Sequence, residues 1–345
     1  MLKSNNINIA SISELPTPAQ IREEFPLSEE NLEKVVGARQ EINDIMDRKS
    51  RKKIMIVGPC SIHDTESAME YAGRLKKLSD EVSDRLLLVM RVYFEKPRTT
   101  LGWKGLIYDP ELNDSYNISK GLRIARKLLL DIVELGLPTA TEMLEPVVPQ
   151  YIADTVSWGA IGARTTESQT HRQMASGLSM PIGFKNATDG SIQVAIDAIK
   201  TAMSPHSFIG ITEKGASAVF RTTGNKYGHL VLRGGQTSPN YGAEHIAFAR
   251  VAMQKNKLEP NIIVDCSHAN SLKDPRKQRD VLIDVTAQMK NGEDALIGMM
   301  LESNLLEGSQ KVTPENKPES GVSITDACIG WDETCELIRY MHNNF

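Results

Sequence analysis

The chain has 345 residues, and its 40 Lys and Arg against 44 Asp and Glu give a net charge of −4. This near balance excludes a broad attraction to nucleic acid or to an anionic membrane, so any anion site must be local. The first residues lack an apolar signal core and no uninterrupted apolar run is long enough to span a bilayer, which predicts a cytoplasmic protein.

Residues 1–53 predict an N-terminal extension that precedes the main fold. Thr17 followed by Pro18 is typical of a helix cap and the first helical position. A second helix is expected after Ser28, because apolar residues then recur at helical spacing as far as Ile45. We expect this helix to finish in the basic run 48–53, which is more often a helix end in water than a surface for nucleic acid.

From residue 54 onwards one pattern recurs eight times. A short run rich in aliphatic residues is followed by a polar or charged group and, in most cases, by an amphipathic helical stretch. The runs are 54–57, 86–90, 138–141, 160–163, 181–184, 229–232, 262–264 and 295–301. This alternation predicts an α/β fold, a (β/α)8 barrel whose reactive groups gather at the carboxyl ends of its strands. A doubly wound open sheet is the alternative, but the chain has no glycine motif of the dinucleotide-binding or phosphate-cradling type.

Two segments do not fit the strand and helix repeat. Residues 207–211 and 216–220 alternate as in a β-hairpin, which we place at about 207–222 as an insertion outside the barrel. The polar stretch 307–326 carries Gly308, Pro314, Pro318 and Gly321 and predicts a loop over the barrel mouth. The predicted organisation is therefore an N-terminal extension, 1–53, and a barrel, 54–345, that carries the hairpin.

Cations lie at or just past four of the eight predicted strand ends. They are Arg91, Lys96, Arg98, Arg164, Lys185 and Arg233. A single basic loop is usually solvated, and structural ion pairs would use one or two of these groups. So many at one rim would repel each other unless carboxylates such as Glu142 or a multiply charged ligand compensated. We expect substrates that carry several negative charges, phosphates plus a carboxylate.

Four potential metal ligands converge on the same rim. Cys60, His268 and Glu302 end predicted strands, and Asp326 lies in the last loop. Each alone has an ordinary explanation as a small buried residue, a hydrogen-bonded core residue or a turn residue. Together they suit Mn²⁺, Fe²⁺ or Zn²⁺ better than Mg²⁺ or Ca²⁺, and such an ion would act as a Lewis acid on a carbonyl oxygen. None of the four cysteines is spaced as C-x-x-C, so we expect thiols or metal ligands before disulfides.

Several long motifs closely resemble the 3-deoxy-D-arabino-heptulosonate-7-phosphate (DAHP) synthases of the short, amino-acid-regulated microbial type, class Iα. They are GPCSIHD at 58–64, RVYFEKPRTT at 91–100, GAIGARTTES at 159–168, GFKN at 183–186, LRGG at 232–235, SHAN at 267–270 and SITDAC at 323–328. The resemblance covers nearly the whole chain, and no expected active-site position departs from the pattern. It implies a transferase that condenses phosphoenolpyruvate with erythrose 4-phosphate and water to DAHP and phosphate. That reaction begins the shikimate pathway to chorismate and the aromatic amino acids.

The same resemblance implies roles for individual residues. Phosphoenolpyruvate would be held by Arg91, Lys96, Glu142, Gly162, Ala163, Arg164, Lys185 and Arg233. Pro97, Arg98 and Thr99 would hold erythrose 4-phosphate. Cys60, His268, Glu302 and Asp326 would bind one divalent ion, with Mn²⁺ favoured in vitro, that polarises the aldehyde while C3 of phosphoenolpyruvate attacks it and water adds at C2. Lys96 is the candidate proton donor to the new hydroxyl, and we expect its cationic neighbours to lower its pKa.

The resemblance further implies an inhibitor pocket and subunit contacts, in a tetramer or a dimer, built from the extension and the hairpin. The pocket would be lined by Pro149, Gln150, Leu178, Ser179, Phe208, Gly210 and Phe220, with Asn5 and Asn6 from a neighbouring chain. Relatives inhibited by phenylalanine tend to carry serine at the position of Gly210, where glycine leaves room for a phenolic hydroxyl. Tyrosine is therefore the predicted inhibitor and phenylalanine the second candidate.

Other functions remain compatible with such a barrel. One is a non-catalytic metabolite sensor, although a sensor has no reason to keep a costly charge cluster. Another is the related synthase of an eight-carbon sugar acid phosphate, which uses arabinose 5-phosphate, whereas the turn 96–99 favours the shorter aldose. A third is an aldolase that forms a Schiff base through Lys185. Because Cys328 follows Asp326 closely, we also expect that oxidation of the metal-free protein can join Cys328 to Cys60.

Overall fold

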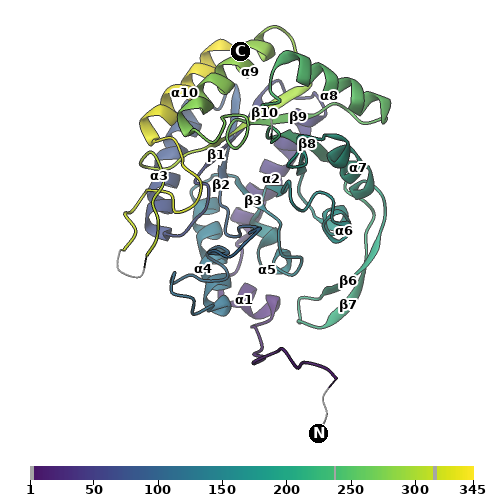
Figure 1. Ribbon diagram of the computed structural model, residues 1–345, viewed down its shortest axis with the longest axis vertical. Helices are drawn as coiled ribbons and strands as arrows, with labels where there is room; N and C mark the ends of the chain where they lie inside the picture. Colours follow the sequence, from purple (N-terminus) through teal and green to yellow (C-terminus); the bar gives the residue numbers. More distant parts are fainter. Residues whose placement is uncertain (1–3, 237, 314–316) are drawn as a thin grey trace.

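The computed structural model describes residues 4–236, 238–313 and 317–345. Eight parallel strands close into a barrel in the order β1-β10-β9-β8-β5-β4-β3-β2, and helices surround it (Figure 1). The predicted (β/α)8 barrel is confirmed, and the open sheet is excluded because β1 pairs with both β2 and β10. Within the described part of the chain, no helix is long and apolar enough to cross a membrane.

Each of the eight predicted runs corresponds to a barrel strand. The strands are β1 (Lys53–Gly58), β2 (Leu86–Arg91), β3 (Thr139–Glu142), β4 (Trp158–Ile161), β5 (Ile182–Lys185), β8 (Gly228–Leu232), β9 (Ile262–Asp265) and β10 (Leu296–Glu302). The position of the fourth was wrong, because β4 ends at Ile161 rather than at Ala163. The main-chain NH groups of Thr165 and Thr166 both donate to the carbonyl of Gly162 at 3.0 Å, so the chain turns there instead of continuing the ladder.

The helices cover the outside of the barrel and bury their apolar faces against it. They are α3 (Thr65–Val82), α4 (Ile118–Glu134), α5 (Pro149–Ile152), α6 (Gln169–Gly177), α7 (Gln193–Ala202), α8 (Ala243–Lys255), α9 (Gln278–Lys290) and α10 (Trp331–Asn344), with 3₁₀ turns η1 (Ala153–Thr155) and η2 (Pro275–Lys277). In α4, for example, Leu122, Leu129 and Ile132 are buried at helical spacing. The strands are thereby covered on their outer face, as parallel sheets require.

Two further helices, α1 (Pro18–Glu24) and α2 (Glu29–Met46), form in the N-terminal extension. Both predicted starts are confirmed, since Thr17 makes a capping box with α1 and Ser28 caps α2. The predicted end of α2 was wrong, because the helix stops at Met46 and Arg48 adopts a left-handed conformation with φ 61°. The last turns of α2 pack against the apolar interior of the barrel and close its amino end.

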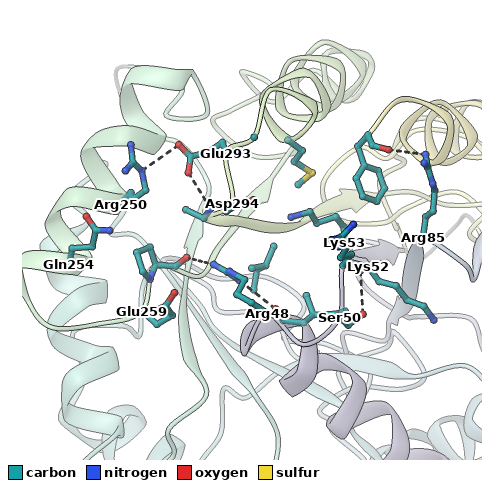
Figure 2. Close-up of a pocket in the computed structure, with 18 of the residues that line it drawn as sticks. Arg48, Ser50, Lys52, Lys53, Arg85, Arg250, Gln254, Glu259, Glu293 and Asp294 are labelled. Atoms are coloured by element: carbon teal, nitrogen blue, oxygen red, sulfur yellow. Dashed lines mark hydrogen bonds and ion pairs between the residues drawn. The ribbon is translucent and has the colours of Figure 1, made fainter.

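A cavity of about 1280 Å³ lies beside this closure, at the amino end of the barrel (Figure 2). Its cations mainly bind main-chain carbonyls: Arg48 donates to Pro260 O at 2.9 Å and Lys53 to Leu296 O at 2.7 Å. Burial, with the charge of Arg48, lowers the pKa of Lys53 to about 8. In (β/α)8 barrels the amino end serves stability and the carboxyl end carries the chemistry, so we assign these contacts to holding the loops.

The predicted hairpin is confirmed as an antiparallel pair, β6 (Ser207–Ile211) and β7 (Ser217–Arg221), outside the barrel sheet. Phe208 lies opposite Phe220 in its register. Figure 1 shows the hairpin reaching away from the barrel on the side of α5 and α6, while the N-terminal residues extend from α1. The two parts expected to serve regulation therefore project from the same end of the molecule.

Arg126 ties the N-terminal extension to the barrel. This residue of α4 is 1% exposed, and its guanidinium donates to Phe25 O at 2.8 Å and to Tyr151 O at 2.9 Å. Two further donors reach the carboxylate of Asp154 at 2.7 and 2.9 Å. One buried guanidinium thus forms hydrogen bonds with a carbonyl at the end of α1, a carbonyl of α5 and a carboxylate.

We predict that Arg126→Met lowers the free energy of unfolding by about 3 kcal/mol, because it removes the bidentate partner of Asp154 and the donor to two main-chain carbonyls. Arg123→Met is the matched control on the same helix, since Arg123 pairs with Glu24 in solvent and its loss costs only about 0–1 kcal/mol. Guanidinium titrations followed by tryptophan fluorescence measure both. Equal losses of unfolding free energy in the two variants would contradict the view that burial makes the Arg126 contacts the stronger ones.

Candidate active site at the carboxyl end of the barrel

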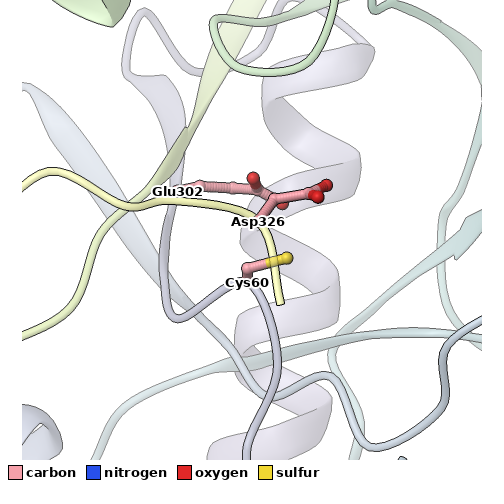
Figure 3. A group of neighbouring side chains, drawn as sticks. All are labelled: Cys60, Glu302 and Asp326. Carbon is pink, nitrogen blue, oxygen red and sulfur yellow. The ribbon is translucent and has the colours of Figure 1, made fainter. Parts of the chain in front are cut away.

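Cys60, Glu302 and Asp326 meet at the carboxyl end of the barrel (Figure 3). Their ligand atoms all lie within 4.8 Å of one another, although they come from the loop after β1, the end of β10 and the last loop. His268, which follows β9, brings its Nε2 to 3.8 Å from Glu302 Oε1. All four metal ligands expected from the sequence are therefore neighbours.

The chemistry of this group fits a divalent ion. Burial raises the pKa of the Cys60 thiol, and the charge of Glu302 raises it further. Burial alone would raise the pKa of Glu302 as well, but His268 and Arg91 outweigh it and keep the pKa below its usual value. A thiol, an imidazole and two carboxylates that share a small space suit a transition-metal ion, which would compensate their negative charge.

Asp265 orients the histidine of this group. Its Oδ2 is 3.0 Å from Nδ1 of His268, which leaves Nε2 on the side of Glu302. Burial would raise the pKa of Asp265, but His268 and Lys185 hold it well below its usual value. His268 itself has φ 57°, a strained conformation of the kind that surrounding contacts hold at functional sites. No role was predicted for Asp265, although it ends its strand just as the predicted residues do.

Three of the predicted cations are held inside the barrel mouth, two by carboxylates and one beside the thiol of Cys60. Arg91 donates to Glu302 Oε1 at 2.9 Å, and both side chains are 1% exposed. Lys185 donates to Asp265 Oδ2 at 2.8 Å, and Lys96 Nζ lies 3.2 Å from Cys60 Sγ. The inner cations therefore lie among the candidate metal ligands. We call Cys60, His268, Glu302 and Asp326 the metal-ligand group.

The expected lowering of the pKa of Lys96 was wrong. Burial does lower this pKa, but the neighbouring Cys60 and Glu302 raise it by more than burial and the repulsion from Arg91 lower it, so the pKa is raised. The sequence showed the cations near Lys96 along the chain. Cys60, in the loop after β1, and Glu302, at the end of β10, are close to Lys96 in space but far from it along the chain.

The remaining predicted cations form an outer layer. Arg164 is exposed and donates to Pro97 O at 3.2 Å, and Arg98 is exposed and donates to Trp103 O at 2.8 Å. Arg233 is half-buried, and burial lowers its pKa. Thr99 is exposed on the same turn as Arg98. The site therefore has a buried inner layer of charge and a solvent-facing rim.

Glu142 lies between these layers, at the end of β3. A Cβ on Gly162 would collide with Glu142 Oε1, so the glycine allows the carboxylate to approach the turn that contains Gly162 and Ala163. Glu95 is a buried neighbour that was not predicted, and burial raises its pKa to about 8. Its Oε1 accepts from Tyr108 OH at 3.3 Å and from the NH of Glu145 at 3.3 Å.

The loop that carries Asp326 is fastened across the barrel mouth. Ser61 Oγ and Thr325 Oγ1 are 2.7 Å apart, and Ser320 Oγ donates to Asp64 Oδ2 at 2.7 Å. The loop predicted over the mouth is present in its described part, and Pro314 lies outside the described residues. Cys328 is buried beside Cys60, whose charge, after burial, raises the pKa of Cys328. Their oxidation to a disulfide stays a prediction.

The residues expected to line an inhibitor pocket lie on α5, after α6 and on the hairpin. Phe208 and Phe220 stack with centroids 5.7 Å apart, and a Cβ on Gly210 would lie 3.0 Å from the Phe220 ring. Arg22 joins α5 to the hairpin turn, because it donates to Gln150 O at 2.8 Å and to Glu213 at 2.6 Å. The other expected residues are Pro149 at the start of α5, Leu178 and Ser179 after α6, and Asn5 and Asn6 in the exposed N-terminal arm. Their binding of an inhibitor stays a prediction.

Comparison with known proteins agrees with this geometry. The model of the DAHP synthetase I family matches residues 24–339. The chain is 52% identical to the Tyr-sensitive phospho-2-dehydro-3-deoxyheptonate aldolase of Escherichia coli (strain K12), over 99% of this chain and 96% of that protein. It is 51% identical to the Phe-sensitive enzyme of the same organism, over 99% and 97%.

A solved structure has the same fold. The phospho-2-dehydro-3-deoxyheptonate aldolase of Francisella tularensis SCHU S4 matches with a TM-score of 0.96 and 45% sequence identity, and the match covers 98% of each chain. A family model and relatives that span almost the whole chain, together with the charge layers at the barrel mouth, lead to one conclusion. The chain belongs to the DAHP synthetase I family.

Proposed function

We infer that this chain catalyses the reaction of its family, the condensation of phosphoenolpyruvate with erythrose 4-phosphate and water to DAHP and phosphate, under feedback by an aromatic amino acid. The observation that supports this most strongly is the interleaving of Arg91, Lys96 and Lys185 with a metal-ligand group at the carboxyl end of the barrel. Two phosphorylated substrates, one of them also a carboxylate, match that concentration of positive charge.

The two charge layers suit the two substrates. Phosphoenolpyruvate is held by the inner cations Arg91, Lys96 and Lys185, with Glu142 and the main chain at Gly162 and Ala163. Arg164 and Arg233 of the outer layer complete this subsite. Arg98 and Thr99 hold the phosphate of erythrose 4-phosphate at the rim, and Pro97 limits the freedom of this turn. The carbonyl of Pro97 accepts from Arg164 at 3.2 Å, which couples the two subsites.

Cys60, His268, Glu302 and Asp326 would hold one divalent ion, Mn²⁺, Fe²⁺ or Zn²⁺. When bound, it supplies Lewis-acid activation of the aldehyde of erythrose 4-phosphate. Asp265 fixes the ring of His268 with Nε2 available as a ligand. Lys96, beside Cys60 Sγ, is the candidate donor of the proton that the new hydroxyl takes up when C3 of phosphoenolpyruvate bonds to the aldehyde carbon. Water adds at C2, and phosphate leaves as the C–O bond breaks.

We predict that chelation with EDTA abolishes condensation and that Mn²⁺ restores it.

Asp265→Asn should weaken Mn²⁺ binding by about 10–100-fold, because the amide no longer holds His268 as the carboxylate does. Calorimetric titration with Mn²⁺ measures this independently of turnover. Asp274→Asn is the control, since this carboxylate caps an exposed turn and pairs with the exposed Arg276. Unchanged Mn²⁺ affinity in Asp265→Asn would refute the orienting role.

Replacement of Arg98 tests the division between the subsites. Arg98→Gln should raise KM for erythrose 4-phosphate by about 10–100-fold, the effect of losing a charge-assisted hydrogen bond, and leave KM for phosphoenolpyruvate within about twofold. Initial rates with each substrate varied give both values, and Arg276→Gln, an exposed arginine beside Asp274, is the control. Equal losses for both substrates would contradict the division. Arabinose 5-phosphate in the same assay distinguishes the eight-carbon synthase.

Tyrosine is the proposed feedback inhibitor, and phenylalanine the second candidate. The Tyr-sensitive and Phe-sensitive relatives are almost equally identical to this chain, so overall identity does not favour either inhibitor. The preference for tyrosine therefore rests on Gly210. Initial rates should fall at lower concentrations of tyrosine than of phenylalanine. Gly210→Ser places a side chain against the Phe220 ring and should weaken tyrosine inhibition by about tenfold or more. Ser217→Ala on the exposed strand β7 is the control, and stronger inhibition of the parent enzyme by phenylalanine would overturn the choice.

A further inference from the structure

Tyr93 lies at the floor of the proposed site, two residues past Arg91. It is 1% exposed, and its carbonyl accepts from the NH of Ile62 at 2.9 Å, which fixes its main chain against the loop after β1. The centroid of its ring is 4.1 Å from Cζ of Arg91 and 5.4 Å from Nζ of Lys96. One aromatic ring thus contacts the buried Arg91 and the half-buried Lys96, which would otherwise repel each other, and cation–π attraction offsets part of that repulsion.

The hydroxyl of Tyr93 is buried, yet within the described residues no protein atom forms a hydrogen bond with it. Burial raises its pKa, as do the charges of Glu142, Asp265 and Glu302, whereas Arg91 lowers it. These charged groups end β3, β9, β10 and β2, so the hydroxyl lies where the strand ends converge. It remains protonated at neutral pH and is available as a donor.

Within the described residues the protein offers this buried hydroxyl no partner, and a buried polar group that stays unpaired lowers the stability of the fold. Phenylalanine would keep the ring contacts with Arg91 and Lys96 and remove this cost. Packing therefore explains the ring but not the hydroxyl. Groups that lower stability and face a binding site are commonly retained because they contact a ligand.

We propose that the Tyr93 hydroxyl contacts the substrate and donates a hydrogen bond to an anionic oxygen of phosphoenolpyruvate, while the ring sets the spacing of Arg91 and Lys96. This inference rests on the proposed function. Phosphoenolpyruvate is favoured over the aldose phosphate because Tyr93 contacts the inner cations, whereas Arg98 is at the exposed rim. An oxygen of the bound substrate then accepts the hydrogen bond from the Tyr93 hydroxyl.

Tyr93→Phe tests this proposal, because it deletes only the hydroxyl. The ligand-free variant should unfold at the same temperature as the parent or about 1–3 °C higher, since an unpaired polar group is removed. Its dissociation constant for phosphoenolpyruvate, measured by calorimetry, should rise by about tenfold, the effect of one hydrogen bond to a charged group. KM for phosphoenolpyruvate should rise in parallel, and KM for erythrose 4-phosphate should stay within about twofold.

Tyr71→Phe is the matched control. Tyr71 is equally buried, but its hydroxyl donates to Ser303 Oγ at 2.9 Å, so its loss should lower thermal stability without changing phosphoenolpyruvate affinity. The opposite signs of the stability change in the two variants separate a substrate contact from a structural one.

Two results would overturn the proposal. If Tyr93→Phe loses stability and binds phosphoenolpyruvate as the parent does, the hydroxyl is structural, although the parent's condensation activity would still support the proposed function. If the parent binds no phosphoenolpyruvate and releases no phosphate with both substrates and Mn²⁺, the proposed function and this inference fail together.

Discussion

The buried ion pair between Arg91 and Glu302 is the interaction on which the site depends. Both side chains are 1% exposed and 2.9 Å apart, so neither charge has solvent to stabilise it if the other is lost. Glu302 also belongs to the metal-ligand group, and the Arg91 guanidinium lies over the Tyr93 ring. Arg91, Glu302 and Tyr93 therefore form one electrostatic unit, in which a change at one member alters the environment of the other two.

The barrel separates this concentration of charge, at its carboxyl end, from the apolar interior and the amino end. Below the charged layer the interior is apolar and is closed at the amino end by the last turns of α2. At that end Arg48 and Lys53 donate to main-chain carbonyls. Parallel strands place every carboxyl end at the opposite rim, so residues from strands that are far apart in the sequence reach one space.

Prediction from the sequence succeeded where a local pattern carried the information. Thr17 and Ser28 mark helix starts by capping chemistry, and the strand ends showed where the cations would gather. It failed where distant groups decide the outcome. The pKa of Lys96 rises because the fold brings Cys60 and Glu302, which are distant in the sequence, close to it. Asp265 likewise contacts His268 and Lys185, and the Lys185 contact joins residues from two strands.

The order of strands and helices, the polar residue at each strand end and the family motifs were determined by the sequence alone, because hydrophobic periodicity and capping are short-range properties. Which charges share a space was decided only by closure of the barrel. Closure makes β1 a neighbour of β10, and so places Cys60 beside Glu302 and Arg91 against a carboxylate from the other end of the chain. Electrostatic energy depends on distance through the fold, and separation along the chain does not report that distance.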